Sequence, residues 1–306
     1  MEDELDDPSG PLSALTGKLI YGFAGDLYTY DLSSGSIDLI AELKGRQGPF
    51  ISPDGAFFTT NNWPGNNEGV AVWSTESNTI LKEFNLPRTL IADDLGVKIA
   101  PGGSLFSGIL TASAGTSTDL TVLNDQGSAV YRLDGDLIRM KGHVWDNAQN
   151  LYFTGEVLQG TQTGIKILAK VANLDAPAII IIRTFDGTFL DVPDQLAISR
   201  DGRQVTYAYN QDIWVGATSE NASDHRLCFQ ATQTLSSPVF SPDAQDIAMV
   251  MRNSDTSLRG DIHIAQIPEN GSLELLPDGP SKLPGPNSSL NSTWASGNDS
   301  SLGWIN

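Results

Sequence analysis

Short runs of alternating apolar and polar residues fill this chain, and they recur in a constant order. An apolar residue, a Ser-Pro-Asp-Gly-like turn and a β-rich run follow one another in ISPDGAFFTT at Ile51, ISRDGRQVTY at Ile198 and FSPDAQDIAM at Phe240. Weaker copies keep the same order and begin at Ile99, Trp145 and Trp294. Because Pro and Asp favour a tight turn and Gly accepts a positive φ, each copy predicts a hairpin that joins two strands.

The copies lie 42 to 54 residues apart, which is the length of one four-stranded propeller blade. Further alternating runs recur in phase with them. Third strands are expected at residues 25–32, 69–74, 119–124, 164–171, 212–217 and 261–267. Fourth strands are expected at residues 36–43, 79–84, 129–133, 178–185, 226–231 and 272–276. We therefore predict an all-β, six-bladed β-propeller of four-stranded antiparallel blades.

The two ends of the chain are offset from the repeat. The N-terminal part supplies a second, third and fourth strand, beginning with LIYGF at Leu19, but it has no first strand. We expect the missing strand at residues 291–296, so that a C-terminal strand enters the first blade and no sheet edge stays open. LGWI at Leu302 looks like a further second strand that competes with LIYGF for one place.

A single propeller domain is expected over residues 17–306, preceded by a flexible acidic tether over residues 1–16. The tether, MEDELDDPSGPLSALT, has too few apolar residues to pack. No signal peptide precedes it, which would imply the cytoplasm if Met1 is native. A charged tether is also what remains after a signal or lipid anchor is removed. We favour this second interpretation and expect an extracytoplasmic protein, in the periplasm or at the cell surface, lipid-tethered in its full-length form.

The repeat resembles that of TolB-like propellers. The resemblance rests on the turns at residues 52–55, 199–202 and 241–244 and on downstream Asp-led strands such as those at residues 25–30 and 260–264. It covers most of residues 18–305, with departures at Gly102 and at Trp145-Asp-Asn-Ala. It implies the fold and, if TolB-like binding proteins are the guide, a partner peptide at the mouth of the central channel. The same repeat occurs in surface proteins and in propeller domains of hydrolases and lyases, so it does not choose among functions.

Composition narrows the choice of partner and chemistry. The formal net charge of −19 argues against binding nucleic acid or anionic lipid, and no apolar run is long enough to span a membrane. Cys228 is the only cysteine, so no intramolecular disulfide forms. The three histidines fall in separate blades without metal-ligand spacing, and no Gly-x-Ser-x-Gly motif occurs. We therefore expect no cofactor, no metal site and no serine-hydrolase chemistry.

The function favoured by the sequence is a non-enzymatic protein-binding or assembly module. Trp63, in the loop at residues 61–69, is suited to stacking on a sugar or peptide, and loops at residues 111–118, 156–163 and 253–260 would share its rim. Basic residues ahead of inner strands would line the other rim and bind carboxylates, namely Arg46, Arg88, Arg139 and Lys141. Asp94 and His143 complete the candidate binding set. No catalytic residue is assigned.

The alternative is a glycan-active lyase or hydrolase. Such an enzyme needs carboxylates that converge on the channel, one as an acid and another as a base or nucleophile. The acidic residues near inner strands are the candidates, namely Asp93, Asp94, Asp146, Asp191 and Asp194. With 37 acidic residues in the chain, several fall at such places by chance, so binding remains the preferred hypothesis.

Overall fold

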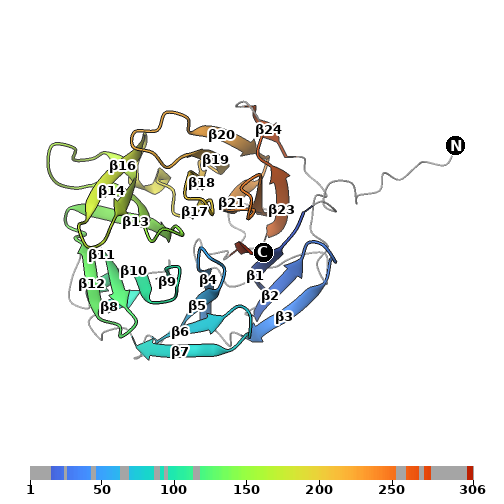
Figure 1. Ribbon diagram of the computed structural model, residues 1–306. Coiled ribbons are helices and arrows are strands. Elements are labelled where there is room, and N and C mark those ends of the chain that lie inside the picture. Colours follow the sequence, from blue (N-terminus) through green and yellow to red (C-terminus); the bar gives the residue numbers. More distant parts are fainter. Residues whose placement is uncertain are drawn as a thin grey trace.

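Six β-sheets surround a central axis as the blades of a propeller (Figure 1). The computed structural model describes residues 15–23, 26–42, 46–62, 69–85, 90–92, 96–112, 118–252, 260–268, 272–276 and 302–305. The prediction of an all-β, six-bladed propeller is confirmed. Residues 1–14 of the predicted tether lie outside the described part of the chain.

The first three blades combine strands in the predicted order. Blade 1 contains β25 (Leu302–Ile305), β1 (Lys18–Phe23), β2 (Asp26–Asp31) and β3 (Ile37–Glu42). Blade 2 contains β4 (Arg46–Ile51), β5 (Phe57–Asn62), β6 (Gly69–Ser74) and β7 (Ile80–Asn85). In blade 3, β8 (Leu90–Ala92) and β9 (Lys98–Ile99) both pair with β10 (Leu105–Ala112), which is followed by β11 (Thr118–Asn124) and β12 (Ala129–Leu133).

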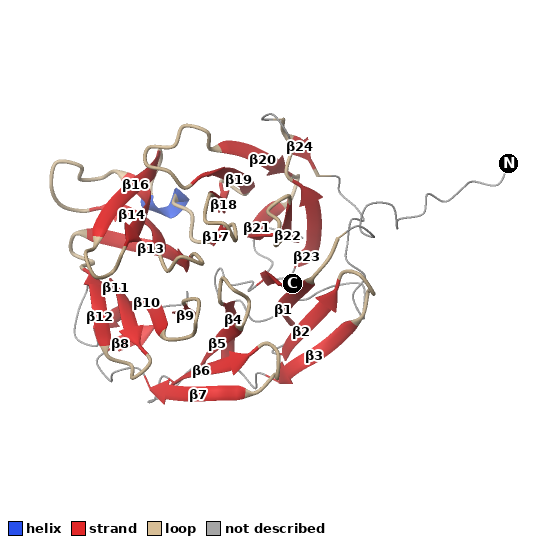
Figure 2. Cartoon of the chain, in the orientation of Figure 1, coloured by secondary structure: helices blue, strands red, loops and turns tan. Residues whose placement is uncertain are grey.

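The other three blades continue the ring and include its one described helix. Blade 4 contains β13 (Ile138–Trp145), β14 (Leu151–Val157), β15 (Lys166–Ala172) and β16 (Ala178–Phe185). The short 3₁₀ helix η2 (Phe189–Asp191) leads from it to the next blade (Figure 2). Blade 5 contains β17 (Leu196–Ile198), β18 (Gln204–Tyr209), β19 (Asp212–Ala217), β20 (Arg226–Gln230) and β24 (Glu274–Leu275). Blade 6 contains β21 (Thr234–Phe240), β22 (Asp246–Arg252) and β23 (Gly260–Gln266).

The Ser-Pro-Asp-Gly turns join the first two strands of their blades, as predicted. Ser52, Ser199 and Ser241 are buried, and each hydroxyl lies 2.5 to 2.7 Å from an oxygen of the following Asp. The same hydroxyl accepts the backbone N–H that opens the next strand, at 2.9 to 3.0 Å. Gly55 and Gly202 have φ of 72° and 73°, which is the left-handed conformation that the turn requires. Local chemistry therefore fixes these hairpins.

The divergent turn of blade 4 reaches the same geometry with a carboxylate. Asp146 is 2% exposed and takes the place of the turn serine. Its Oδ1 accepts the backbone N–H groups of Ala148 and Asn150 at 2.9 and 2.8 Å. Its Oδ2 accepts the Asn150 amide at 2.7 Å and the Tyr152 hydroxyl at 3.1 Å. Both oxygens thus serve the turn, which removes the basis for Asp146 as a catalytic acid or base.

The ring closes through the last described strand. β25 pairs antiparallel with β1, with Leu19 opposite Trp304, and occupies the inner position of blade 1. A C-terminal strand does enter the first blade, but it is LGWI itself, so the expected competition with LIYGF was wrong. Two alternating segments can pair with each other as easily as they can compete for one position, and the sequence does not distinguish these outcomes. Residues 291–296 lie outside the described residues.

One outer strand joins a different blade from the one predicted. Residues 272–276 were expected as the fourth strand of blade 6, yet β24 pairs parallel with β20 of blade 5, with Phe229 opposite Glu274. The Leu276 N–H donates to the Gln230 carbonyl at 2.8 Å, and Leu276 packs in the apolar cluster between blades 5 and 6. Burial of Leu276 in that interface stabilises the pairing of β24 with blade 5 instead of blade 6.

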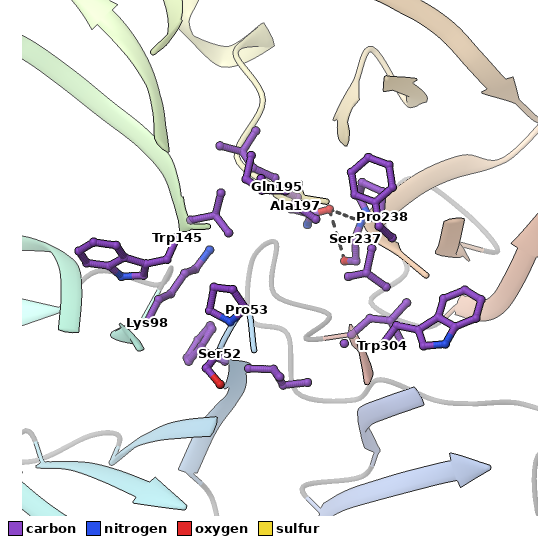
Figure 3. Close-up of a pocket in the computed structure, with 18 of the residues that line it drawn as sticks. Ser52, Pro53, Lys98, Trp145, Gln195, Ala197, Ser237, Pro238 and Trp304 are labelled. Atoms are coloured by element: carbon purple, nitrogen blue, oxygen red, sulfur yellow. Dashed lines mark hydrogen bonds between the residues drawn. The ribbon is translucent and has the colours of Figure 1, made fainter. Parts of the chain in front are cut away.

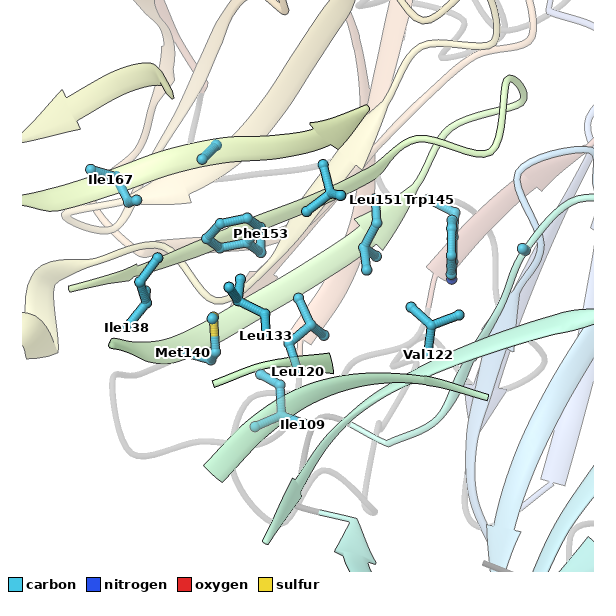
Figure 4. Close-up of a cluster of buried hydrophobic side chains, with 13 residues drawn as sticks. Ile109, Leu120, Val122, Leu133, Ile138, Met140, Trp145, Leu151, Phe153 and Ile167 are labelled. Carbon is cyan, nitrogen blue, oxygen red and sulfur yellow. The ribbon is translucent and has the colours of Figure 1, made fainter. Parts of the chain in front are cut away.

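Hydrophobic clusters lie between neighbouring blades, one at each of the six interfaces. The largest joins blades 3 and 4 and includes Trp145, Phe153 and Val122 (Figure 4). Alternation along each strand sends one set of side chains to each neighbouring blade, which explains why third strands such as β11 and β15 are buried on both faces. The clusters hold the inner strands in place around the axis.

Candidate functional site

A cavity of about 180 Å³ lies on the axis of the ring, and the inner strands of all six blades line it. Pro53, Lys98 and Ser237, from three different blades, face the same central space (Figure 3). Most of the residues that line it are apolar, including Phe50, Val144, Leu196, Pro238, Val239 and Leu302. Asp194 is the one carboxylate among the described residues that line it.

A polar clamp between blades 5 and 6 shapes one wall of the cavity. Ser237 has φ of 50°, a left-handed conformation that is uncommon for a residue other than glycine. The Gln195 Oε1 accepts the Ser237 N–H at 2.6 Å and its hydroxyl at 3.4 Å. β21 shifts its register against β22 at this point, between Ser236 and Val239. The clamp stabilises a bulge that turns Pro238 toward the axis.

Lys98 brings a positive charge to the opposite wall. Its Nζ donates to the backbone carbonyl of His143 at 2.6 Å, which ties blade 3 to blade 4. Asp194 approaches blade 4 from the other side, and its backbone lies so near Gly142 that an added Cβ would come within 2.5 Å of the Asp194 carbonyl oxygen. Gly142 is therefore required for the close approach of β13 to the residues ahead of β17.

His143 does not reach the cavity or the surface. Its side chain is fully buried, and its Nε2 donates to the Ser107 carbonyl at 3.2 Å. Because a carbonyl can only accept, the proton is on Nε2. Burial, and secondly the positive charge of Lys98, hold the pKa of His143 well below its usual range. His143 is therefore a neutral residue of the interface between blades 3 and 4, with no surface to offer a partner.

Acidification should weaken the fold before the carboxylates titrate. His143 and His225 both have lowered pKa values, with that of His225 at about 4, mainly because of burial. Below about pH 6.5 the unfolded chain therefore takes up protons at these two histidines that the folded chain refuses, and their contribution to the free energy of unfolding falls as the pH falls. Urea titrations at about pH 7 and about pH 5 measure the fall. His143→Gln should reduce it, whereas an equal fall in this variant would contradict the assignment.

Arg139 and Lys141 lie where β13 begins, and both positive side chains lie against η2. The Arg139 guanidinium carbon is 3.9 Å from the centre of the Phe189 ring, and the Lys141 Nζ is 5.9 Å from it. Lys141 also donates to the Leu190 carbonyl at 2.5 Å. Burial lowers the pKa of Lys141, opposed by the negative charges of Asp194 and Asp191. This positions a basic, partly aromatic surface beside the residues that lead into the cavity.

In blade 4 the basic residues and the long loop belong to the same rim. Arg46 is paired with Asn62 and Arg139 with Glu156, so the start of each inner strand lies beside the end of the second strand. The loop at residues 156–163 therefore emerges at the end of blade 4 where Arg139 lies, whereas residues 63–68, 113–117 and 253–259 of the other three loops lie outside the described residues. The expectation of two opposite rims was wrong, because an antiparallel pair brings the start of one strand to the end of its neighbour.

The other residues predicted to bind a partner are Arg46, Trp63, Arg88 and Asp94. Arg46 is placed by its backbone in β4, whereas Trp63, Arg88 and Asp94 lie outside the described residues. Asp191 is exposed and accepts hydrogen bonds from Thr188, which, together, lower its pKa. Within the described residues, no group of three His, Cys, Asp or Glu side chains could hold a metal ion, and no helix is long and apolar enough to cross a membrane.

Two features of this site were missed from the sequence. The Gln195–Ser237 clamp joins residues 42 positions apart and leaves no local pattern, although Ser-Pro within a predicted strand signals a bulge. The second missed feature is the aromatic ring of Phe189 beside Arg139. It follows the turn-forming pair Asp186-Gly187, and this pattern could have indicated an aromatic side chain on a surface turn.

Comparisons with known proteins agree with the fold. TolB from Acinetobacter baumannii superposes with a TM-score of 0.58 at 14% identity, over 82% of this chain and 61% of that one. A protein assigned as TolB from Agrobacterium tumefaciens gives 0.57 at 13% identity, over 83% and 86% of the two chains. A chain of a nidogen/laminin complex gives 0.53 at 11% identity, over 80% and 88%.

These similarities show a shared propeller and no closer relationship. The chain spans about three fifths of the length of the Acinetobacter TolB. It matches no protein-family profile, and no curated protein resembles it in sequence.

Proposed function

We propose that this propeller is a non-enzymatic protein-binding or assembly module that takes a peptide or protein segment at the rim where the basic residues begin the inner strands. The observation that carries the proposal is Arg139, which is exposed at the start of inner strand β13 and stacked on the Phe189 ring. Guanidinium groups stacked on aromatic rings still offer N–H donors to a carboxylate. Propellers often bind proteins through such a rim, and one similar propeller comes from a nidogen/laminin complex.

The net charge of the chain supports a partner that is recognised through specific local contacts rather than through long-range electrostatic attraction. At −19 the molecule repels polyanions, so the rim arginines would attract individual carboxylates of a polypeptide instead of an anionic polymer. In this proposal Arg46 and Arg88 extend the basic rim from Arg139, while Trp63 and Asp94 contribute from neighbouring loops. In this proposal the protein acts outside the cytoplasm, in the periplasm or at the cell surface.

The glycan-active alternative has less support from the described residues. Asp146 accepts hydrogen bonds within its turn, and Asp191 accepts hydrogen bonds from Thr188. Asp194 is the single described carboxylate in the cavity lining. Hydrolysis or elimination at a glycosidic bond needs two groups that converge. Asp93 and Asp94 lie outside the described residues, so this alternative becomes an outcome of the test.

Removing the three rim arginines should strongly reduce partner capture. The native propeller and an Arg46→Ala, Arg88→Ala, Arg139→Ala variant would be used as baits in a cell-envelope extract, with Arg203→Ala as the control. Arg203 is exposed on a turn at the opposite end of blade 5. We expect a protein retained by the native and control baits and at least about tenfold less by the triple variant, because charged hydrogen bonds at a rim are lost.

Two results would contradict the proposal. Equal retention by all three baits would place the interface elsewhere. If nothing is retained and acidic polysaccharides release sugars when incubated with the propeller, the glycan-active alternative would replace it.

A further inference from the structure

The turn that contains η2 presents the most exposed large apolar side chain of the described residues. Leu190 is 80% exposed, compared with 39% to 54% for the other large apolar residues at the surface. Single exposed leucines are common, so exposure alone decides nothing. The distinguishing feature of Leu190 is the rigid support of its backbone.

Side-chain and backbone bonds hold both ends of this turn. Asp191 Oδ2 accepts the Thr188 N–H at 2.6 Å and the Thr188 hydroxyl at 2.8 Å. The Val192 N–H donates to the Phe189 carbonyl at 3.2 Å, and Lys141 binds the Leu190 carbonyl at 2.5 Å. A side chain presented on a fixed backbone loses little conformational entropy when it is buried by a partner.

Arg139 provides the charged half of the same surface. Neighbouring charges have partners of opposite sign: the Lys166 Nζ lies 3.7 Å from the Glu156 Oε1, and the negative charges of Asp194 and Asp191 act on Lys141. Among the described residues, Arg139 has no carboxylate within ion-pair distance, and its guanidinium instead covers Phe189. An approaching carboxylate would therefore pair with Arg139 without displacing an existing partner.

Two further leucines lie at this end of blade 4. Leu137 precedes β13 and Leu158 follows β14, and the Leu158 N–H donates to the Leu137 carbonyl at 2.8 Å. They are 45% and 39% exposed. This end of blade 4 thus combines exposed apolar side chains with the positive charge of Arg139.

We propose that Leu190 and Arg139 together form the anchor for a partner segment in which an apolar residue lies beside an Asp or Glu. This inference rests on the proposed protein-binding function and specifies the chemistry of its partner. The apolar residue packs on Leu190, while the carboxylate accepts hydrogen bonds from the guanidinium stacked on Phe189. Arg and aromatic side chains on a rigid support are typical of residues that dominate interface energies.

A library of displayed 12-residue random peptides would test the anchor. The native propeller would be the bait, and selected peptides would be measured by fluorescence polarisation against native protein, Leu190→Ser, Arg139→Ala and Arg139→Lys. We expect enrichment of an acidic residue next to Leu, Ile, Val or Phe, with affinity about tenfold weaker for Leu190→Ser and for Arg139→Ala. Arg139→Lys should recover part of the loss, because it keeps the charge but not the planar stack.

The control is Leu39→Ser, which removes a 51% exposed leucine from the outer strand of blade 1 and should leave binding unchanged. Peptides that lose binding with Arg139→Ala but not with Leu190→Ser would overturn the anchor and leave the proposed function standing. Peptides unaffected by either change, peptides enriched in Lys or Arg, or no enrichment over an unrelated bait would count against both. Thermal melts of each variant confirm that the fold is retained.

Discussion

A chain that ends after Ser301 should lose a large part of its stability, because the inner strand of blade 1 closes the ring. Removal of β25 breaks the ladder with β1, in which Lys18 lies opposite Ile305 and Tyr21 opposite Leu302. It also removes apolar contacts with two interface clusters, through Leu302 and Trp304 on one side and Ile305 on the other. We expect the free energy of unfolding to fall by on the order of 3–5 kcal/mol, since three half-buried apolar residues and a strand of hydrogen bonds are lost.

Urea denaturation followed by tryptophan fluorescence would measure this loss. A chain ending after Ile305 keeps the whole strand and is the matched control. Gly303→Val gives a second route to the same effect, since its side chain would overlap that of Ile51, so that Ile51 must repack or β25 must move away from β4. If the chain ending after Ser301 is as stable as the control, β25 does not close the ring in solution.

The hairpins were predictable because their chemistry is local. The hydrogen bonds of the Ser52 hydroxyl are all made to residues of the same short turn, so a sequence pattern suffices to place the turn. The same logic extends to Asp146, where a longer side chain gathers the same kinds of backbone N–H groups. Regular spacing of these turns then predicts the number of blades.

Strand partners were harder to predict, because pairing is decided by tertiary contacts. By its alternating pattern, LGWI could either pair with LIYGF or take its place in the sheet. The packing of Trp304 and Leu302 against blade 6 selects the inner position beside LIYGF. The residues of β24 likewise satisfy the pattern of an outer strand, while the burial of Leu276 at the interface of blades 5 and 6 decides which blade they join.

The candidate site was predictable in part. Arg139, expected just ahead of an inner strand, is the second residue of β13, and its side chain is exposed. The same argument failed for His143, four residues further along β13, since the strand has by then entered the interface and its side chain faces Ser107. The partner of Arg139 could not be inferred, because Phe189 is 50 residues away and approaches only through the turn after β16.

Replacing Asp146 by Ala should be among the most destabilising single changes in the described part of the ring. Four donors would lose their acceptor, namely the N–H groups of Ala148 and Asn150, the Asn150 amide and the Tyr152 hydroxyl. The site is buried, so water replaces these bonds poorly, and each unsatisfied donor costs about 1–3 kcal/mol. Allowing for relaxation of the turn, we expect a loss of roughly 3–4 kcal/mol in the free energy of unfolding.

Asp146→Ser is the informative partner of this variant, because serine fills the equivalent position in the turns at Ser52, Ser199 and Ser241. Its hydroxyl can accept one backbone N–H, so about half of the stability should return. Equal losses for Ala and Ser would show that the carboxylate charge, rather than the turn, is what the site requires.

Partner capture measured on both variants separates a structural role of Asp146 from a direct role in binding. If Asp146 serves only the turn, capture follows the folded fraction, whereas loss of capture in a fully folded variant would reveal a direct role in binding.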